Sequence, residues 1–180
     1  RSSAASDVYK RQVKRSKSFS TYRKNVKEAA MTWMTNLYNT EPGFKERPLS
    51  EITLPGTHDA GCYVDHLFGN FQSRTQTQTV GGQLAGGIRY FDIRPYLSRA
   101  QQFWTYHGPF YTGGRVDGDN GILADVKSFM QGLPSNSREL VILNISHFSR
   151  FNDNAHARLV AEITDTIGDY LVPYLSLIHI

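Results

Sequence analysis

The chain has 180 residues, of which 39% are hydrophobic and 20% are charged, with a formal net charge of +4. This length allows one domain with a real core but is short for a complete (β/α) barrel, which typically takes about 250 residues. The single cysteine, Cys62, excludes an intrachain disulfide and a cysteine-based zinc site, and no apolar run reaches the roughly 18 residues of a membrane-spanning helix.

The two ends of the chain read as translated sequencing adapter. Residues 7–12 can be encoded by GAT GTG TAT AAG AGA CAG, and the reverse complement of this DNA encodes residues 175–180. We therefore expect residues 1–12 and 175–180 to be artefact, and residues 13–174 to be a fragment of a longer natural chain. Without these ends, 17 Lys and Arg remain against 15 Asp and Glu, so the net charge falls to +2. This small net charge gives little indication of nucleic-acid binding. The chain also lacks the interleaved aromatic and basic residues that are typical of RNA-binding proteins.

Residues 13–48 are predicted to form a basic arm and an amphipathic helix. Residues 13–24 are basic and rich in serine, which is typical of a flexible arm. Apolar side chains at helical spacing predict a helix over residues 25–37, with Asn25 as a possible cap. We expect its face with Trp33 and Leu37 to pack on the domain rather than in a membrane.

From residue 49 onward, strand patterns alternate with helix patterns. Strands are predicted at residues 50–54, 88–93, 103–106 and 140–145, and helices at residues 78–85, 121–130 and 155–171. The apolar character of residues 140–145 is typical of a strand buried on both faces. The last helix is expected to bury Leu159, Val160, Ile163 and Ile167. This alternation predicts an α/β fold with a parallel sheet, whose functional residues lie at the carboxyl ends of the strands.

Polar groups that suit phosphoryl transfer follow these predicted strands. They are two imidazoles, two carboxylates and one guanidinium: His58, Asp59, Asp92, Arg94 and His107. One histidine can accept a proton from an attacking hydroxyl while the other donates one to the leaving oxygen, and an arginine can bind the phosphoryl oxygens. Each residue also has a structural interpretation: a capping or core histidine, a helix-capping aspartate, or an ion pair inside the sheet.

The order and spacing of three motifs resemble the X region of phosphatidylinositol-specific phospholipase C. The motifs are Thr57-His58-Asp59, the block Gly-Ile-Arg-Tyr-Phe-Asp-Ile-Arg at residues 87–94, and His107-Gly108, within a match over residues 49–148. The resemblance implies that residues 49–174 form the N-terminal half of a TIM-type (β/α) barrel. It also implies cleavage of phosphatidylinositol to diacylglycerol and inositol 1,2-cyclic phosphate.

The resemblance assigns a role to each candidate residue. His58 would be the general base and His107 the general acid, supported by Asp59; Arg94 would bind the phosphoryl oxygens, with Asp92 fixing its fork. Ser146 and His147 would contact substrate, although a local structural role for His147 is equally open. The carboxylate that orients the general base in the bacterial enzymes comes late in the chain and has no expected counterpart before Tyr174, so the site is expected to be incomplete.

Metal-independent catalysis without a cofactor is expected. In the calcium-dependent branch of this family an acidic ligand stands at the position of Arg94 and another acid near Ser146, whereas Ca²⁺ needs several oxygen ligands. The partner implied is a phosphoinositide lipid at a membrane surface, bound peripherally by a monomer in a secreted or membrane-peripheral location. His66 and His156 are expected to be ordinary surface residues.

Two other functions remain open from the sequence. One is a non-catalytic inositol-phosphate or lipid-binding module with the same fold. The other is a barrel phosphodiesterase of the glycerophosphodiester or sphingomyelinase D type. That class uses acidic metal ligands clustered after the first strand, where this chain has Ala60-Gly61.

Overall fold

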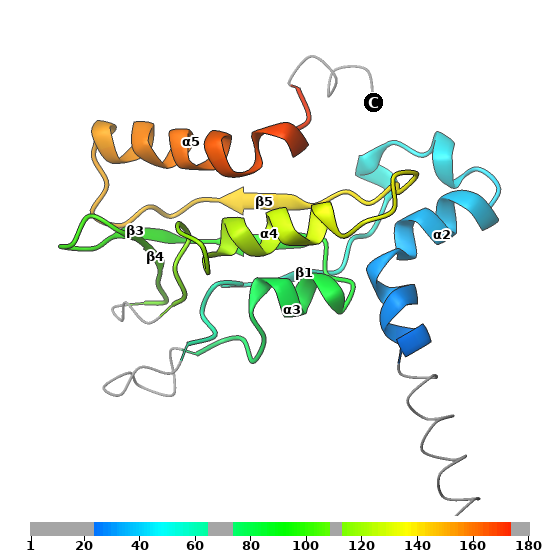
Figure 1. The fold of residues 1–180 in the computed structure, drawn as a ribbon, viewed down its shortest axis with the longest axis horizontal. Helices are drawn as coiled ribbons and strands as arrows, with labels where there is room; N and C mark the ends of the chain where they lie inside the picture. Colours follow the sequence, from blue (N-terminus) through cyan, green and yellow to red (C-terminus); the bar gives the residue numbers. More distant parts are fainter. Residues whose placement is uncertain (1–23, 65–73, 109–112, 174–180) are drawn as a thin grey trace, which may run out of the picture.

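The computed structural model describes residues 24–64, 74–108 and 113–173. The expected adapter segments, the arm at residues 13–23 and His66 lie outside these ranges. Figure 1 shows strands running across the centre, with helices along them. Within the described ranges, no helix has both the length and the apolar character needed to cross a membrane.

A three-stranded parallel sheet forms the centre of the fold. Its order is β1 (Gly56–Thr57), β2 (Tyr90–Ile93) and β5 (Ile142–Ile145), with β2 in the middle. The helices α3 (Val80–Ala85) and α4 (Ile122–Gln131) lie between these strands in the sequence, as parallel pairing requires. Phe91 and Ile93 of β2 are buried in the apolar core. The predicted α/β fold with parallel strands is therefore confirmed, although the described residues form no closed barrel.

A hairpin that the sequence did not predict follows β2. The strand β4 (Phe103–Thr105) lies where a strand was expected, but it pairs antiparallel with β3 (Pro95–Leu97) in a separate two-stranded sheet. Only residues 98–102 connect these strands, and a parallel crossover needs about a dozen residues or more. The short connection therefore forces the antiparallel arrangement.

The first predicted strand is placed wrongly. Residues expected in a strand at 50–54 instead begin in the 3₁₀ turn η2 (Leu49–Glu51), where the Ile52 amide donates to the Leu49 carbonyl. Pairing starts later, because the backbone amides of Arg89 and Tyr90 both donate to the Pro55 carbonyl at the beginning of β2. Within the described residues, the pairing with β2 therefore begins at Gly56, opposite Tyr90, and residues 52–54 lie before it.

The N-terminal helix is found near its predicted position, as two segments. Residues 24–31 and α2 (Trp33–Thr40) are helical, with a break at Thr32, where φ is −127°. Asn25 is not the cap, because Lys24 is already helical. Trp33 donates from Nε1 to the Gly87 carbonyl at 2.9 Å, so this face contacts the body of the domain. The 3₁₀ turn η1 (Phe44–Glu46) follows α2, and Figure 1 places α2 at the opposite end of the strands from the β3–β4 hairpin.

The last helix is α5 (Asp153–Ile167), followed by the 3₁₀ turn η4 (Gly168–Tyr170). Leu159 and Ile167 are buried as predicted and Ile163 is partly buried, but Val160 is 62% exposed. The prediction for Val160 is wrong because α5 packs along one narrow stripe only.

The prediction that β5 is buried on both faces is also wrong. Asn144 is exposed, and Ile142, Leu143 and Ile145 are only partly buried. Its side chains are only partly covered because β5 is an edge strand of the described sheet.

Candidate active site

The candidate site lies at the carboxyl ends of β1 and β2. His58 directly follows β1, Asp92 is the third residue of β2, and Arg94 comes directly after β2. Side chains alternate along a strand, so Asp92 and Arg94 share the face opposite Phe91 and Ile93, which are buried in the core. The sheet itself thus brings the imidazole of His58, the carboxylate of Asp92 and the guanidinium of Arg94 together.

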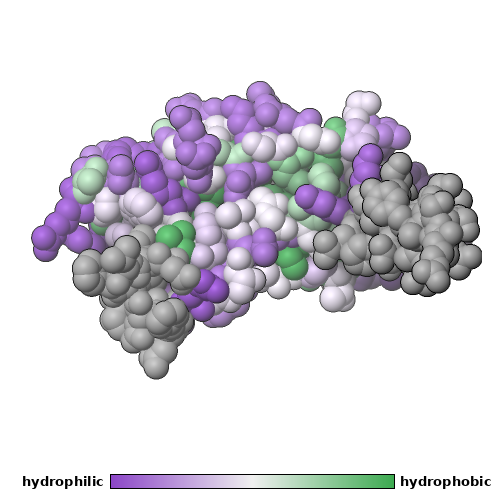
Figure 2. Space-filling model, turned by 60° about the horizontal axis from the view of Figure 1, so that its bottom comes forward, coloured by the Kyte–Doolittle hydropathy of each residue, from purple (hydrophilic) through white to green (hydrophobic). Residues whose placement is uncertain are grey.

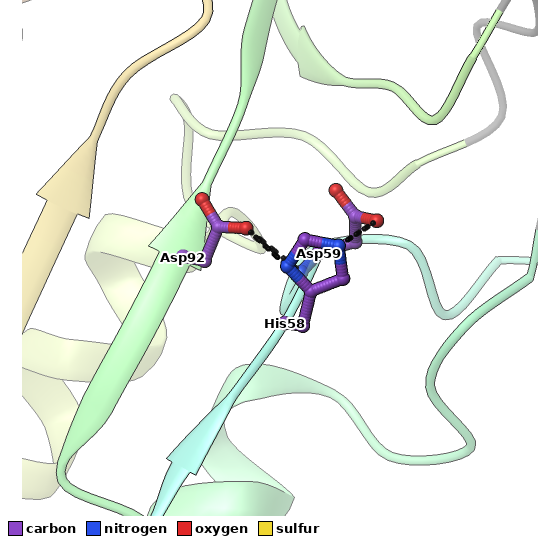
Figure 3. Close-up of side chains that lie close together, drawn as sticks. All are labelled: His58, Asp59 and Asp92. Atoms are coloured by element: carbon purple, nitrogen blue, oxygen red, sulfur yellow. Dashed lines mark hydrogen bonds and ion pairs between the residues drawn. The ribbon is translucent and has the colours of Figure 1, made fainter.

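His58 lies between two carboxylates, as Figure 3 shows. Its Nδ1 is 2.8 Å from Oδ2 of Asp92, and its Nε2 is 3.2 Å from Oδ2 of Asp59. The imidazole side chain is 68% exposed, whereas the side chain of Asp59 is fully buried and that of Asp92 is 11% exposed. A solute can therefore reach the imidazole while both carboxylates stay shielded.

Asp59 is a buried carboxylate shared by three potential cations. Besides His58, Nε of Arg94 lies 3.2 Å from its Oδ1, and Nε2 of His107 lies 3.6 Å from its Oδ2. Neither carboxylate oxygen accepts a hydrogen bond from any described residue. The contacts of Asp59 with the two histidines and the arginine are therefore ion pairs without hydrogen bonds. Both of its carboxylate oxygens remain available as hydrogen-bond acceptors.

The turn after β1 positions Asp59. Its φ of +47° lies in the left-handed region, which aspartate tolerates better than most residues. The backbone amide of Asp59 donates to Oδ2 of Asp92 at 3.3 Å, and the next amide, of Ala60, donates to the Asp92 carbonyl at 2.9 Å. A Cβ on Gly61 would clash with Thr105. Glycine therefore lets β4 approach closely, and β4 carries His107 two residues beyond its end.

Two glutamines that the sequence reasoning missed hold this turn. The buried Gln83 of α3 accepts from the Thr57 hydroxyl at 2.7 Å and donates to the Ala60 carbonyl at 2.9 Å. Gln76 donates to the His58 carbonyl at 2.8 Å. For Gln83, the available signal was a polar residue on the inward face of the helix predicted at residues 78–85; Gln76 precedes that helix and gave no such signal.

Cys62 lies just beyond the turn and is buried. Burial, reinforced by the negative charge of Asp59, raises the pKa of its thiol to about 12. The thiolate is thus scarce at neutral pH, and Cys62 is no nucleophile in this site.

Ser146 and His147 lie at the end of the neighbouring strand. The Ser146 amide donates to the Ile93 carbonyl, and the His147 carbonyl accepts from the Tyr106 hydroxyl at 2.6 Å. His147 is exposed with φ of +55°. Among the residues that the structure describes, no hydrogen bond or ion pair joins the side chain of Ser146 or His147 to the five clustered residues. Their substrate contacts remain a prediction.

A cation could in principle bind the same carboxylates. Ligand atoms of His58, Asp59 and Asp92 all lie within 4.8 Å of one another. However, Arg94 already contacts Oδ1 of Asp59 through Nε and Oδ2 of Asp92 through Nη2, at 3.2 and 3.1 Å. The guanidinium thus supplies the positive charge that a metal would bring, which favours the metal-free interpretation.

Two histidines and an arginine thus surround a buried aspartate at the carboxyl edge of the sheet. No family model matches the chain. It is 30% identical over 171 residues to the human PI-PLC X domain-containing protein 2, covering 80% of this chain and 52% of that protein. It is 27% identical over 147 residues to the 1-phosphatidylinositol phosphodiesterase of Listeria monocytogenes, covering 79% of this chain and 41% of that enzyme.

A solved structure agrees with these relatives. Phosphatidylinositol-specific phospholipase C from Listeria monocytogenes superposes with a TM-score of 0.55 at 26% identity, over 78% of this chain and 46% of that one. The resemblance to phosphatidylinositol-specific phospholipases C and their X domains is therefore confirmed. The chain spans about half the length of the curated relatives it matches.

Proposed function

We propose that this site cleaves the phosphodiester of phosphatidylinositol by intramolecular attack of the inositol 2-hydroxyl. The products would be diacylglycerol and inositol 1,2-cyclic phosphate. One observation carries the proposal: the buried carboxylate of Asp59 lies within 3.6 Å of both imidazoles and of the Arg94 guanidinium. General acid, general base and an anion-binding fork are thus gathered around one point.

Each residue has a role in this mechanism. Nε2 of His58 takes the proton of the 2-hydroxyl as that oxygen bonds to phosphorus, and the bond from phosphorus to the diacylglycerol oxygen breaks. His107 gives its proton to the departing oxygen, and Asp59 stabilises the charged form of His107 beforehand. Arg94 donates hydrogen bonds to the phosphoryl oxygens, on which negative charge accumulates. Ser146 and His147 contact the head group.

The substrate places the reaction at a membrane surface. Because diacylglycerol stays in the bilayer, the protein would work from the surface as a peripheral protein. The relative from Listeria monocytogenes is by name a phosphodiesterase of this lipid. Arg94 takes the electrostatic role of a metal ion, so the proposed reaction needs no cation.

A second candidate is a binding module that holds an inositol phosphate without turnover. The described sheet ends at the edge strand β5 and forms no closed barrel, and binding an anion requires less exact alignment of groups than two proton transfers do. A phosphodiesterase of the glycerophosphodiester or sphingomyelinase D type is disfavoured, because the relatives are named for phosphatidylinositol.

Phosphorus-31 NMR of phosphatidylinositol in detergent micelles separates these functions. We expect the resonance of a five-membered cyclic phosphate to grow in excess EDTA. His58→Ala and His107→Ala should each lower this rate by about a hundred- to ten-thousand-fold, since each removes one proton-transfer group. His156→Ala replaces an exposed histidine outside the site and is the matched control.

Other outcomes of this experiment would contradict parts of the proposal. A rate restored by Ca²⁺ after chelation would overturn the metal-free mechanism. Saturable binding of inositol phosphate with no cyclic product would favour the binding module. A wild-type rate in either site variant would remove that histidine from its proposed role.

A further inference from the structure

We propose that Gln83 is a positioning residue for the turn that carries His58 and Asp59. Its side chain bonds to the residues on both sides of this pair, Thr57 and Ala60, and so sets where the pair lies against β2. The consequence for turnover rests on the proposed function, whereas the effect on the turn can be measured without substrate.

The side-chain amide of Gln83 uses both of its N–H groups and its oxygen. Nε2 donates to the carbonyls of Ala60 and Gln78, each at 2.9 Å, and Oε1 accepts from the Thr57 hydroxyl at 2.7 Å. The two carbonyls can only accept, so the NH2 group must face them and the oxygen must face Thr57. The bonds therefore allow only one orientation of the amide.

Burial makes these bonds harder to replace than the bond from Gln76. Gln83 is 6% exposed and its bond to Ala60 is buried, whereas Gln76 donates to the His58 carbonyl at an exposed site. A buried polar group that loses its partner bears the full cost of having left water, while water replaces a partner lost at the surface. Gln83 is therefore the stronger of the two supports.

The helix that carries Gln83 is itself fixed in place. Val80 and Leu84 of α3, which flank Gln83 in the sequence, are fully buried in the core. The Gly81 amide donates to Oδ2 of Asp125 in α4 at 2.8 Å, which joins the two helices. Gln83 thus reaches the turn from a rigid element, as accurate positioning of a site requires.

Two backbone amides of the turn connect it to β2. The strand β1 pairs with β2 over only two residues, the second of which is Thr57. Beyond it, the Asp59 amide donates to the Asp92 side chain at 3.3 Å, and the Ala60 amide donates to the Asp92 carbonyl at 2.9 Å. Exchange of these amide hydrogens with solvent requires the two bonds to open, so their exchange rates report how firmly the turn is held.

Amide hydrogen exchange of the full chain, followed by NMR, tests the role of Gln83. Thr57→Val keeps the branched shape of the side chain but removes the hydroxyl, which leaves Oε1 of Gln83 buried without its partner. We expect the Asp59 and Ala60 amides to exchange roughly ten- to a hundred-fold faster, while the amides of α4 keep their wild-type rates. Thr57→Ser retains the hydroxyl and should restore the wild-type rates at both amides. In a Gln83→Met background, Thr57→Val should have no further effect, because the bond is already absent.

Thr164→Val is the matched control for the loss of a threonine hydroxyl. That hydroxyl donates to the Val160 carbonyl at an exposed site in α5, so its loss should leave the Asp59 and Ala60 amides unchanged. Unchanged exchange at the turn in folded Thr57→Val would overturn the proposal, as would an equal acceleration throughout the chain. A Thr57→Ser variant that exchanges as fast as Thr57→Val would also overturn it, since the hydroxyl would then have no role.

Turnover of the lipid tests whether the position of the turn matters for catalysis. A displacement of about 1 Å in a catalytic group can lower the rate about a hundred-fold. We expect Thr57→Val to lower kcat by roughly ten- to a hundred-fold with little change in KM, and Thr57→Ser to recover it. A wild-type kcat in a Thr57→Val variant whose turn opens faster would exclude the positioning role. A wild-type chain that cleaves no lipid would count against the proposed function alone, because the exchange experiment uses no substrate.

Discussion

Arg94 connects the two carboxylates of the site through different nitrogens. Its Nε faces Oδ1 of Asp59, and its Nη2 faces Oδ2 of Asp92, at 3.2 and 3.1 Å. The side chain is 24% exposed, so part of the planar fork remains accessible to an anion. The same guanidinium can thus hold the site together and bind a phosphoryl group.

Arg94→Lys should therefore be strongly damaging despite conserving charge. A lysine ammonium is a single point and cannot span both carboxylates while it also binds the phosphate. Loss of one transition-state donor typically costs about a hundred- to a thousand-fold in turnover. We expect a fall of that order in kcat, measured by cyclic phosphate formation, with a smaller change in KM. Arg115→Lys alters an arginine paired with Asp117 and should keep the wild-type rate. Equal rates for Arg94→Lys and wild type would exclude a bidentate role.

The thiol of Cys62 should be unreactive toward thiol reagents in the folded chain. Burial and the nearby negative charge of Asp59 raise the pKa of its thiol from 9.0 to about 12, so the reactive thiolate is scarce at neutral and mildly alkaline pH. We expect almost no reaction with a disulfide reagent at pH 8 in native buffer, and one full equivalent in denaturant.

The same shift predicts a pH dependence of stability. The unfolded thiol loses its proton near pH 9 while the folded one keeps it, so the free energy of unfolding should fall as pH rises from about 9 toward 12. Cys62→Ala should flatten that part of the profile. Rapid labelling of the native protein at pH 8 would contradict this view of the thiol.

At the scale of elements, a buried ion pair joins the N-terminal helices to the sheet. Arg89 donates from Nε and Nη2 to Oε2 of Glu139, at 2.9 and 2.7 Å, and both side chains are fully buried. Nη2 of Arg89 also donates to the Met31 carbonyl at 2.6 Å, and Glu139 accepts from the amide and hydroxyl of Thr35. Three segments distant in the sequence thus share one network.

Breaking this network should destabilise the fold. Arg89→Met leaves the Glu139 charge buried without its partner, which typically costs about 3–5 kcal/mol. Arg138→Met removes an exposed arginine beside the Tyr38 ring and should change stability by less than about 0.5 kcal/mol. Urea denaturation followed by circular dichroism measures both. A loss in Arg89→Met as small as in the control would show that the pair is dispensable.

The elements also show what local patterns can and cannot predict. The helices α3, α4 and α5 were placed well, because an inward stripe at helical spacing is a property of the segment itself. Strand pairing depends on neighbours, so the sequence reasoning missed β3 and misplaced β1, which pairs over only two residues.

The sequence could predict that the candidate residues lie together for a similar reason, while their roles stay predictions. His58, Asp59, Asp92, Arg94 and His107 were predicted together because each follows or ends a strand, and parallel strands place such residues at one edge. The Asp92–His58 contact and the support from Gln83 were not predicted, because they depend on side-chain geometry across elements.

At the scale of the whole molecule, the edge strand β5 borders an apolar groove of about 620 Å³. It is lined by β5 together with residues of α4, α5 and η2, among them Val126, Met130, Ile163 and Ile167. Figure 2 shows apolar areas on the face it presents, within a largely hydrophilic surface. In the solved relative the matched region is 46% of a longer chain.

An exposed groove of this kind should bind a small apolar dye in the native state. We expect the chain to enhance the fluorescence of anilinonaphthalene sulfonate under conditions where circular dichroism shows it folded. Ile163→Lys places a charge in the groove and should remove most of the enhancement. Val160→Lys, one turn away on the same helix, replaces a side chain that is already 62% exposed and does not line the groove, so its enhancement should match wild type. An equal loss of fluorescence enhancement in both variants would mean that dye binding depends on the net charge of α5. No enhancement with the wild-type chain would mean that the groove is closed in solution.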